Sequence, residues 1–278
     1  MEKDTVGYRA LTHKCIVIEG KSYSTISSVC GVLRPAFKMA AEDDIIRRNP
    51  FSFKLATIVR NDSKVRQALN QRDQERYLEY VRNSKYYSKY YDEIIILLRT
   101  GMRVSELYGL TKKDVDFNLS RIAVNKQLVR NKHCEYYIEE PKTTSGKRYI
   151  PMTQEVHQAF QRVFQNRKRL NVEKMIDGYS GFLFLDREDK PKVAMHLEHA
   201  MKRMLDRFNE THKEKLPPVT PHVLRHTFCT NMASLGMEVK SLQYLMGHSD
   251  VGVTLNVYTH VGYEKAQASM MQVVGEAN

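Results

Sequence analysis

Arginine, histidine, lysine and tyrosine residues recur in three separated segments of this sequence, at spacings that suit chemistry on a phosphate group. In the first segment, residues 100–107, Arg103 follows a Thr-Gly break and begins a predicted short helix, where main-chain N–H groups favour an anion. Its guanidinium could bind a phosphate through two parallel hydrogen bonds. On this segment alone, however, an ion pair with Glu106 or a solvated surface position explains Arg103 better.

The second segment, residues 141–148, is the predicted tip of a β-hairpin and contains Lys142. A lysine at such a tip can reach a bound substrate, where it could protonate a leaving oxygen or hold a phosphate. Turns are commonly rich in lysine and glycine because they face water, so this segment by itself does not identify a site.

The third segment has the most informative spacing. His222 and Arg225 are three residues apart at the start of a predicted helix, which puts both on one face near its N-terminus. His248 follows directly after a helix-ending glycine, and Tyr258 comes ten residues later. The neighbouring His226 is better explained by helix packing.

Together these side chains form a set that could transfer a phosphoryl group. Two arginines would neutralise the non-bridging oxygens of a pentacoordinate phosphorus, histidine and lysine would move protons, and a tyrosine hydroxyl would attack. Of the 16 tyrosines, only Tyr258 has this spacing from His248. A tyrosine has an ordinary pKa of about 10, so it needs surrounding cations to become nucleophilic. No acidic cluster suggests a metal site, and we predict neither a metal nor a cofactor.

The composition narrows the choice of substrate. Lysine and arginine total 44 against 32 acidic residues, which gives a formal charge of +12 and a pI near 9.4. Such a charge favours a polyanion, either nucleic acid or an anionic membrane. No apolar run approaches the roughly 18 residues of a spanning helix, the N-terminus lacks a signal peptide, and the four cysteines form no CxxC pair. We therefore expect a cytoplasmic protein that binds DNA or RNA.

The elements that must position these residues are mostly helices. Apolar residues at helical spacing run from residue 24 to a stop at Asn49-Pro50, and helical patterns return from residue 70 onward. Among the later helices, three segments have strand composition: residues 122–124, 136–138 and 148–150. We therefore predict a mainly α protein with a small antiparallel β-sheet, divided into residues 1–53, a basic linker at 54–69, a domain at 70–262 and a tail at 263–278.

These motifs resemble those of the tyrosine recombinases (the phage-integrase family), and most closely those of the integrases of conjugative transposons and related integrative elements. The resemblance runs from about residue 24 to residue 262. It depends on the order and spacing of residues 100–107, 222–228, 245–248 and Tyr258.

The resemblance assigns roles to single residues. Tyr258 becomes the nucleophile, Glu106 supports Arg103, and Lys142 matches the lysine that protonates the leaving 5′-oxygen. Lys147 is the alternative to Lys142 if the hairpin register differs. The remaining positions of the catalytic set are Arg103, His222, Arg225 and His248. Further basic residues are expected to contact DNA, namely Lys54, Arg60, Lys64, Arg66, Lys147 and Arg148.

The resemblance further implies a site-specific recombinase that integrates or excises a mobile genetic element. Tyr258 would attack a DNA phosphodiester to give a 3′-phosphotyrosyl link, and a 5′-hydroxyl of a second strand would rejoin the DNA without metal or ATP. Four protomers would act on two duplexes, together with accessory excision or DNA-bending proteins and without a membrane. Residues 263–278 are a candidate helix for contact with a neighbouring protomer, with packing on their own domain as an equal alternative.

Two other functions stay open at this stage. A type IB topoisomerase would use the same chemistry to cut and reseal one strand, and a DNA-binding regulator would keep the fold without turnover. Relatives usually carry an arm-binding domain and a longer core-binding domain than this sequence provides. We therefore expect residues 1–53 to be a truncated, helical core-binding-like domain, and residues 70–262 to be a mixed α+β catalytic domain of the tyrosine recombinase type.

Overall fold

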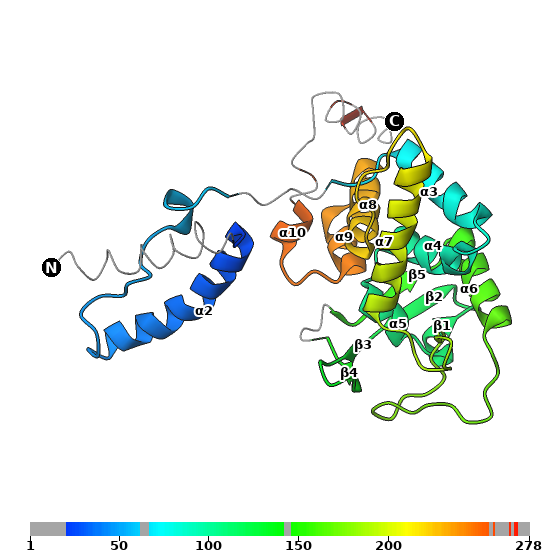
Figure 1. The fold of residues 1–278 in the computed structure, drawn as a ribbon, viewed down its shortest axis with the longest axis horizontal. Coiled ribbons are helices and arrows are strands. Elements are labelled where there is room, and N and C mark those ends of the chain that lie inside the picture. The colour runs from blue at the N-terminus through cyan, green and yellow to red at the C-terminus, as the bar shows by residue number, and fades with distance from the viewer. Residues whose placement is uncertain are drawn as a thin grey trace. The chain divides into compact units, whose positions relative to one another are not determined.

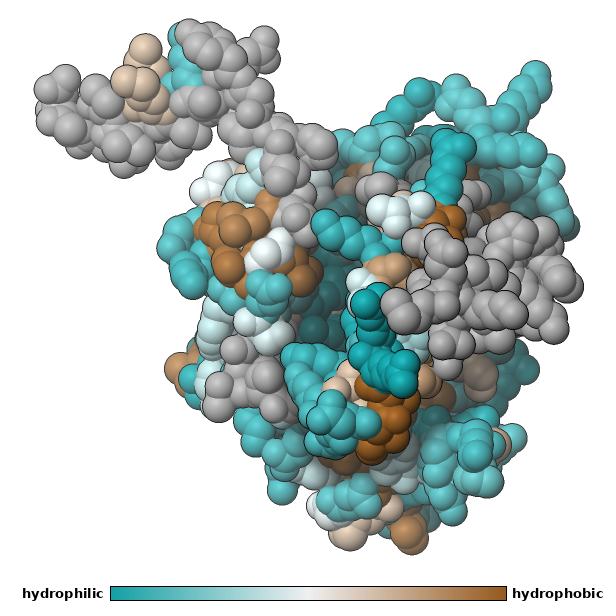
Figure 2. Space-filling model, turned by 90° about the vertical axis from the view of Figure 1, so that its left-hand side faces the viewer, coloured by the Kyte–Doolittle hydropathy of each residue, from teal (hydrophilic) through white to brown (hydrophobic). Residues whose placement is uncertain are grey.

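The computed structural model describes residues 21–61, 67–141 and 146–255, together with Tyr258, Gln267, Met270 and Met271. The chain forms two compact units, Met1–Val65 and Arg66–Asn278. Among the described residues, no helix combines the length and the apolar character needed to cross a membrane. Figure 2 views one face of the molecule, on which hydrophilic residues predominate and hydrophobic residues gather in a few separate patches.

The first unit is organised around α2 (Tyr23–Glu42), which begins where the Ser22 side chain accepts a hydrogen bond from the Thr25 N–H. A short 3-10 helix, η1 (Leu55–Thr57), follows after a series of turns and bends. One side of α2 contributes two residues to a small apolar core, whose buried members are Ile26, Cys30, Phe51, Leu55 and Val59.

Both ends of the predicted linker, residues 54–69, pack within a unit. Leu55 and Val59 are buried in the small core of the first unit. At the other end, Leu69 is buried in the second unit, where its N–H donates to Thr227 Oγ1 at 3.0 Å. The predicted DNA contacts Lys64 and Arg66 lie outside the described residues, whereas Lys54 and Arg60 are exposed.

Helices are the main regular elements of the second unit (Figure 1). In chain order these are α3 (Gln71–Asn83), α4 (Tyr91–Thr100), α5 (Val104–Gly109), α6 (Gln154–Asn166), α7 (Ala194–Thr211), α8 (Pro221–Ser234), α9 (Val239–Met246) and α10 (Val251–Leu255), with 3-10 helices η2 (Ser88–Tyr90) and η3 (Lys112–Asp114).

The core of the second unit is built around α4. The apolar run of residues 94–98, which the sequence predicts to be helical, is buried on every side, and Ile94, Ile95 and Leu97 have no exposed surface. This helix packs against α6 and α8 (Figure 1). Because α8 carries Arg225 and the end of α4 leads to Arg103, this packing brings two predicted site segments together.

Within the described residues, five short strands form two separate antiparallel groups. One is a three-stranded sheet in the order β1 (Val115–Asp116), β2 (Arg121–Val124) and β5 (Arg148–Pro151). The other is the pair β3 (Gln127–Arg130) and β4 (Tyr136–Glu139).

The prediction of a hairpin around residues 141–148 is wrong. The sequence pattern pairs residues 136–138 with 148–150 in one sheet, but β4 pairs with β3 and β5 pairs with β2. Residues 141–147 therefore connect two groups of strands and do not close a hairpin. Strand composition could not separate these pairings, because both place the same side chains on extended backbone.

Replacing a core residue of α4 should destabilise the second unit. For Leu97→Ala we expect the free energy of unfolding to fall by about 2–5 kcal/mol, because the truncated side chain leaves a cavity in a close-packed core. The matched control is Leu119→Ala, at a leucine that is 61% exposed, which should change it by less than about 0.5 kcal/mol. Urea denaturation followed by circular dichroism would measure both, and equal effects would contradict the core assigned to α4.

Candidate active site

Arg103 owes its position to a sharp turn at Gly101. This glycine ends α4 in the left-handed conformation, with φ of 64°, and a Cβ there would lie 2.4 Å from Phe228 Cδ1. Glycine is thus required by both the backbone angle and the close approach of α8. Two residues later Arg103 forms the N-cap of α5, so the Thr-Gly break of the sequence does begin a short helix.

A buried carboxylate joins Arg103 to a second arginine. Glu106 accepts hydrogen bonds from the Arg103 N–H at 2.7 Å and from Arg103 Nη1 at 2.8 Å. Its two oxygens also receive Arg148 Nη1 and Nη2 at 3.1 and 2.9 Å. Burial alone would raise the pKa of Glu106, but the hydrogen bonds and charge of Arg148, followed by the charge of Arg103, hold it below its ordinary value. The Arg103 side chain remains 39% exposed, so it can still meet a ligand.

Arg148 was expected to contact DNA, and the structure contradicts this. Its side chain has 0% exposure, and its Nε donates to the main-chain oxygen of Leu245 at 2.7 Å. The sequence did contain a clue to this burial. In the period-two alternation of β5, Arg148 shares a face with buried Ile150, while the intervening Tyr149 is exposed.

Arg225 lies on α8, near the ends of α4 and α9. Its Nη1 donates to Gly101 O and its Nη2 to Met246 O, both at 2.6 Å, and the residue is only 7% exposed. Burial and then the charge of Arg103 lower the pKa of Arg225 to about 9, so its guanidinium is still charged at neutral pH. Arg103 Nη2 reaches the same turn through Gly247 O at 3.4 Å. The two predicted active-site arginines therefore converge.

His248 joins this cluster at the end of α9. Gly247 ends the helix with φ of 62°, and His248 Nδ1 then lies 3.0 Å from the hydroxyl oxygen of buried Thr254. Burial, followed by the charges of Arg225, Arg103 and Arg148, lowers the pKa of His248 to about 4. The imidazole is therefore neutral at physiological pH. The contribution of Thr254 was not foreseen from the sequence.

Three further predicted site residues are His222, Lys142 and Lys147. His222 is exposed in the first turn of α8, which begins with the Thr220 cap and Pro221, three residues before Arg225. Lys142 lies outside the described residues. Its alternative, Lys147, is exposed and pairs with Glu140 at 2.7 Å, an interaction that raises the pKa of the lysine.

Tyr258 is not brought into the arginine cluster, although a cationic environment was expected for it. Its hydroxyl donates to Met237 O at 2.5 Å, and its side chain packs against the apolar cluster of Phe228, Cys229, Leu242 and Met246. Burial, then Cys229 and Glu238, raise its pKa above the ordinary value of 10. In this structure the tyrosine is therefore a protonated hydrogen-bond donor. The role of Met237 could not be predicted from the sequence, because every residue has a main-chain oxygen and a motif does not indicate which one accepts a hydrogen bond.

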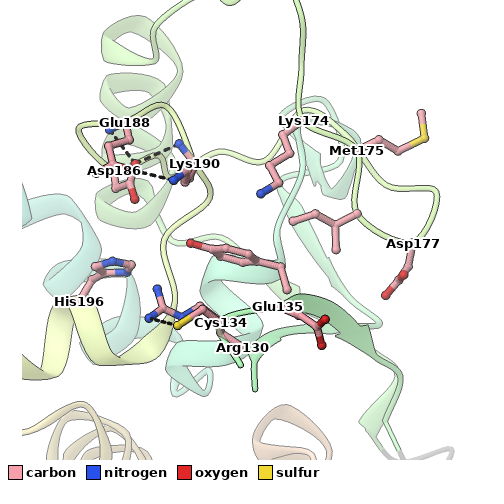
Figure 3. A pocket seen from close by; sticks show the side chains of 12 residues that line it. Arg130, Cys134, Glu135, Lys174, Met175, Asp177, Asp186, Glu188, Lys190 and His196 are labelled. Atoms are coloured by element: carbon pink, nitrogen blue, oxygen red, sulfur yellow. Dashed lines mark hydrogen bonds and ion pairs between the residues drawn. The ribbon is translucent and has the colours of Figure 1, made fainter. Parts of the chain in front are cut away.

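A separate cavity of about 550 Å³ lies between the β3–β4 pair and residues 174–196 (Figure 3). Arg130 donates to Cys134 Sγ across its edge, and Asp186 accepts the main-chain N–H groups of Glu188 and Lys190. These polar groups fix local turns, and none of the predicted catalytic residues lines the cavity. Among the described residues, no three His, Cys, Asp or Glu side chains gather where they could hold a metal ion.

Comparison with known proteins places the chain in a family. The model of the phage integrase family matches residues 67–265. The chain is 45% identical over 254 residues to the transposase from transposon Tn916 of Enterococcus faecalis, covering 91% of this chain and 62% of that relative. It is 27% identical over 255 residues to the tyrosine recombinase XerC of Bacillus subtilis, covering 91% of this chain and 75% of XerC. A structure of the Tn1549 transposon integrase in complex with a circular intermediate DNA superposes with a TM-score of 0.91 at 43% identity, over 97% of this chain and 85% of that one.

The low pKa of His248 should make folding stability depend on pH. Below the ordinary histidine pKa of 6.5 the unfolded chain takes up a proton at His248, whereas the folded chain, with a pKa of about 4, does not. Stability from this source is present above about pH 6.5 and is lost as the pH falls toward 4. We expect the wild type to lose more unfolding free energy between about pH 7.5 and pH 5 than His248→Gln does.

The matched control is His199→Gln, at an exposed histidine of α7, which should retain the pH dependence of the wild type. Urea denaturation at the two pH values would measure all three proteins. The same pH dependence in His248→Gln and the wild type would contradict the environment described for His248.

Proposed function

Because the chain belongs to the phage integrase family, we propose that it is a site-specific DNA recombinase that cleaves and rejoins DNA strands for a mobile genetic element. One observation carries this proposal: Arg103 and Arg225, which are far apart in the sequence, both reach the turn that leads to His248, through Gly247 O and Met246 O. The 45% identity to a transposon transposase supports the role in a mobile element. The chain spans 62% of the length of that relative, so the activity is proposed on the residues described above.

In the proposed reaction the two arginines bind the non-bridging oxygens of one DNA phosphate. Arg103 offers a partly exposed guanidinium, and Arg225 is held rigidly by two main-chain oxygens. Neutral His248 can accept the Thr254 hydroxyl at Nδ1 and donate from Nε2 to a phosphoryl oxygen. Such fixed donors stabilise the charge that develops on a pentacoordinate phosphorus.

Tyr258 is the proposed nucleophile. Its Oη would lose its proton to solvent and form a bond to phosphorus while the bond to the 5′-oxygen breaks and that oxygen takes up a proton, leaving a 3′-phosphotyrosyl link and a 5′-hydroxyl. Lys142 is proposed to protonate that leaving oxygen, and a 5′-hydroxyl of the partner strand would reverse the step. Because the hydroxyl of Tyr258 is bonded to Met237 O, it must exchange that acceptor for the phosphate before it can attack.

The proposed partners follow from charge and relatives. With a formal charge of +12, the protein is suited to bind the duplex backbone, and exposed Lys54 and Arg60 are proposed to contact it. The Tn1549 integrase was solved with DNA, which supports double-stranded DNA as the substrate here. We also propose that four protomers act together with accessory proteins in the cytoplasm. Exposed Met270 and Met271, in the predicted C-terminal helix, are candidates for contact between protomers.

A covalent adduct tests the chemistry directly. On a nicked suicide duplex that carries the end of the element, wild-type protein should form a protein–DNA adduct visible on a denaturing gel. Tyr258→Phe should form none, whereas the matched control Tyr263→Phe should still react. Arg103→Ala should slow adduct formation roughly 10²- to 10³-fold, because one oxyanion donor is lost, while most DNA affinity remains.

The outcomes separate the competing functions. An adduct that survives Tyr258→Phe would exclude this residue as the nucleophile. Wild-type protein that binds the duplex but never forms an adduct would favour a DNA-binding regulator. An adduct that reseals but never exchanges strands would favour a topoisomerase.

The contribution of the first unit to DNA binding can be tested by salt dependence. Replacing Lys54 or Arg60 with alanine should reduce the slope of log affinity against log salt by about one each, because each phosphate contact releases a counterion. The matched control is Lys190→Ala, whose exposed ammonium is paired with Glu188. Fluorescence anisotropy between low and physiological salt would measure the slopes. An unchanged slope for the variants of Lys54 and Arg60 would exclude these two residues from the DNA interface.

A further inference from the structure

Arg148 connects three elements that carry the proposed site. From β5 its guanidinium binds both oxygens of Glu106 on α5 and the main-chain oxygen of Leu245 on α9. Its Nη1 also donates to Gly146 O at 3.2 Å, directly after the segment that contains Lys142. A planar guanidinium with five N–H donors can satisfy such a divergent set of acceptors, and a lysine cannot.

The guanidinium of Arg148 is also packed against the turn that precedes His248. A Cβ at Gly247 would lie 2.8 Å from Arg148 Nη1 and 3.1 Å from its central carbon. Only a residue without a side chain therefore fits between Arg148 and the chain at this point. The close packing sets where the turn, and with it His248, can lie.

The pairing of Arg148 with Glu106 also affects the net charge around Arg103. The charge of Glu106 is felt by Arg225 and His248, and its carboxylate is shared by Arg103 and Arg148. If Glu106 were paired with Arg103 alone, the two charges would cancel. Because Arg148 balances the carboxylate, the positive charge of Arg103 is left for an incoming phosphate.

We propose that Arg148 is a positioning residue for strand cleavage: through Glu106 it fixes the geometry and the free charge of Arg103, and through Leu245 and Gly247 it fixes the turn that carries His248. This inference rests on the proposed function for its chemical consequence. It assigns no contact between Arg148 and DNA, because the side chain is fully buried.

The main test replaces Arg148 with lysine, which keeps a positive charge beside Glu106 but loses the planar guanidinium and its five N–H donors. We expect adduct formation on the nicked suicide duplex to fall roughly 10²-fold, since small displacements of catalytic groups are costly, while DNA affinity stays nearly unchanged. The matched control is Arg167→Lys. Arg167 is also buried and binds a carboxylate, Glu173, and a main-chain oxygen, that of Phe182, but it touches no site residue.

Stability and pH distinguish positioning from a merely structural role. Arg148→Met should unfold at a lower temperature because it leaves the buried Glu106 carboxylate with only one of its two arginine partners, and Arg148→Lys should recover part of that loss in melting temperature without restoring the cleavage rate. In Arg148→Lys the pKa of Glu106 should also lie higher, because the hydrogen bonds of Arg148 lower it most among its neighbours. Adduct formation by this variant should therefore decline toward acid pH before that of the wild type or Arg167→Lys does.

A second readout separates this inference from the proposed function. Binding of inorganic phosphate, measured by calorimetry, requires the arranged arginines but no DNA cleavage, and we expect Arg148→Lys to weaken it roughly tenfold relative to Arg167→Lys. If the wild type forms no adduct but this difference in phosphate binding persists, the proposed function fails and the positioning role stands. If Arg148→Lys matches Arg167→Lys in both adduct rate and phosphate binding, the positioning role is wrong. Should Arg148→Lys not fold, Arg148→Gln, which keeps polar N–H donors beside Glu106, takes its place in both assays, with Arg167→Gln as its control.

Discussion

The buried carboxylate of Glu106 is the interaction on which the arrangement of this site depends. Three guanidinium groups, those of Arg103, Arg148 and Arg225, lie close enough to influence its ionisation, and each would repel the others without it. Removing charges from water is costly unless their partners are well placed, and here the carboxylate is bound by two of the arginines at 2.7 to 3.1 Å. The charges that remain unbalanced belong to the arginines that the proposed function assigns to the phosphate.

Helix ends supply the second set of partners for these cations. Both α4 and α9 end at a glycine in the left-handed conformation, Gly101 and Gly247, and their last carbonyl groups point to guanidiniums. A helix C-terminus carries a partial negative charge, so it stabilises a buried cation while also satisfying carbonyls that have no partner within the helix. The burial of Arg225 is therefore tolerated through main-chain chemistry, which fixes the arginine more rigidly than a flexible acidic side chain would.

Local patterns in the sequence predicted the parts of this site that depend on neighbouring residues. The apolar run of α4, the break at Gly101 and the cap at Thr220 each specify an element by short-range chemistry, and the structure confirms all three. The pairing of β5 with β2 and the burial of Arg148 depend on contacts across many residues, which strand composition alone does not encode. For the same reason the sequence predicted a cationic environment for Tyr258 and missed its bond to Met237 O.

The positions of Tyr258 and His248 impose a sequence of events on the proposed reaction. Burial, followed by Cys229 and Glu238, raises the pKa of Tyr258 and makes it harder to deprotonate than in water, whereas neutral His248 already lies among the arginines. The cations can therefore bind a phosphate before the nucleophile arrives, and the tyrosine becomes reactive only when it leaves Met237 for that cationic environment. In the proposed reaction this order would keep Tyr258 unreactive until a phosphate is bound, because its hydroxyl would meet the arginines only together with the phosphate that they hold.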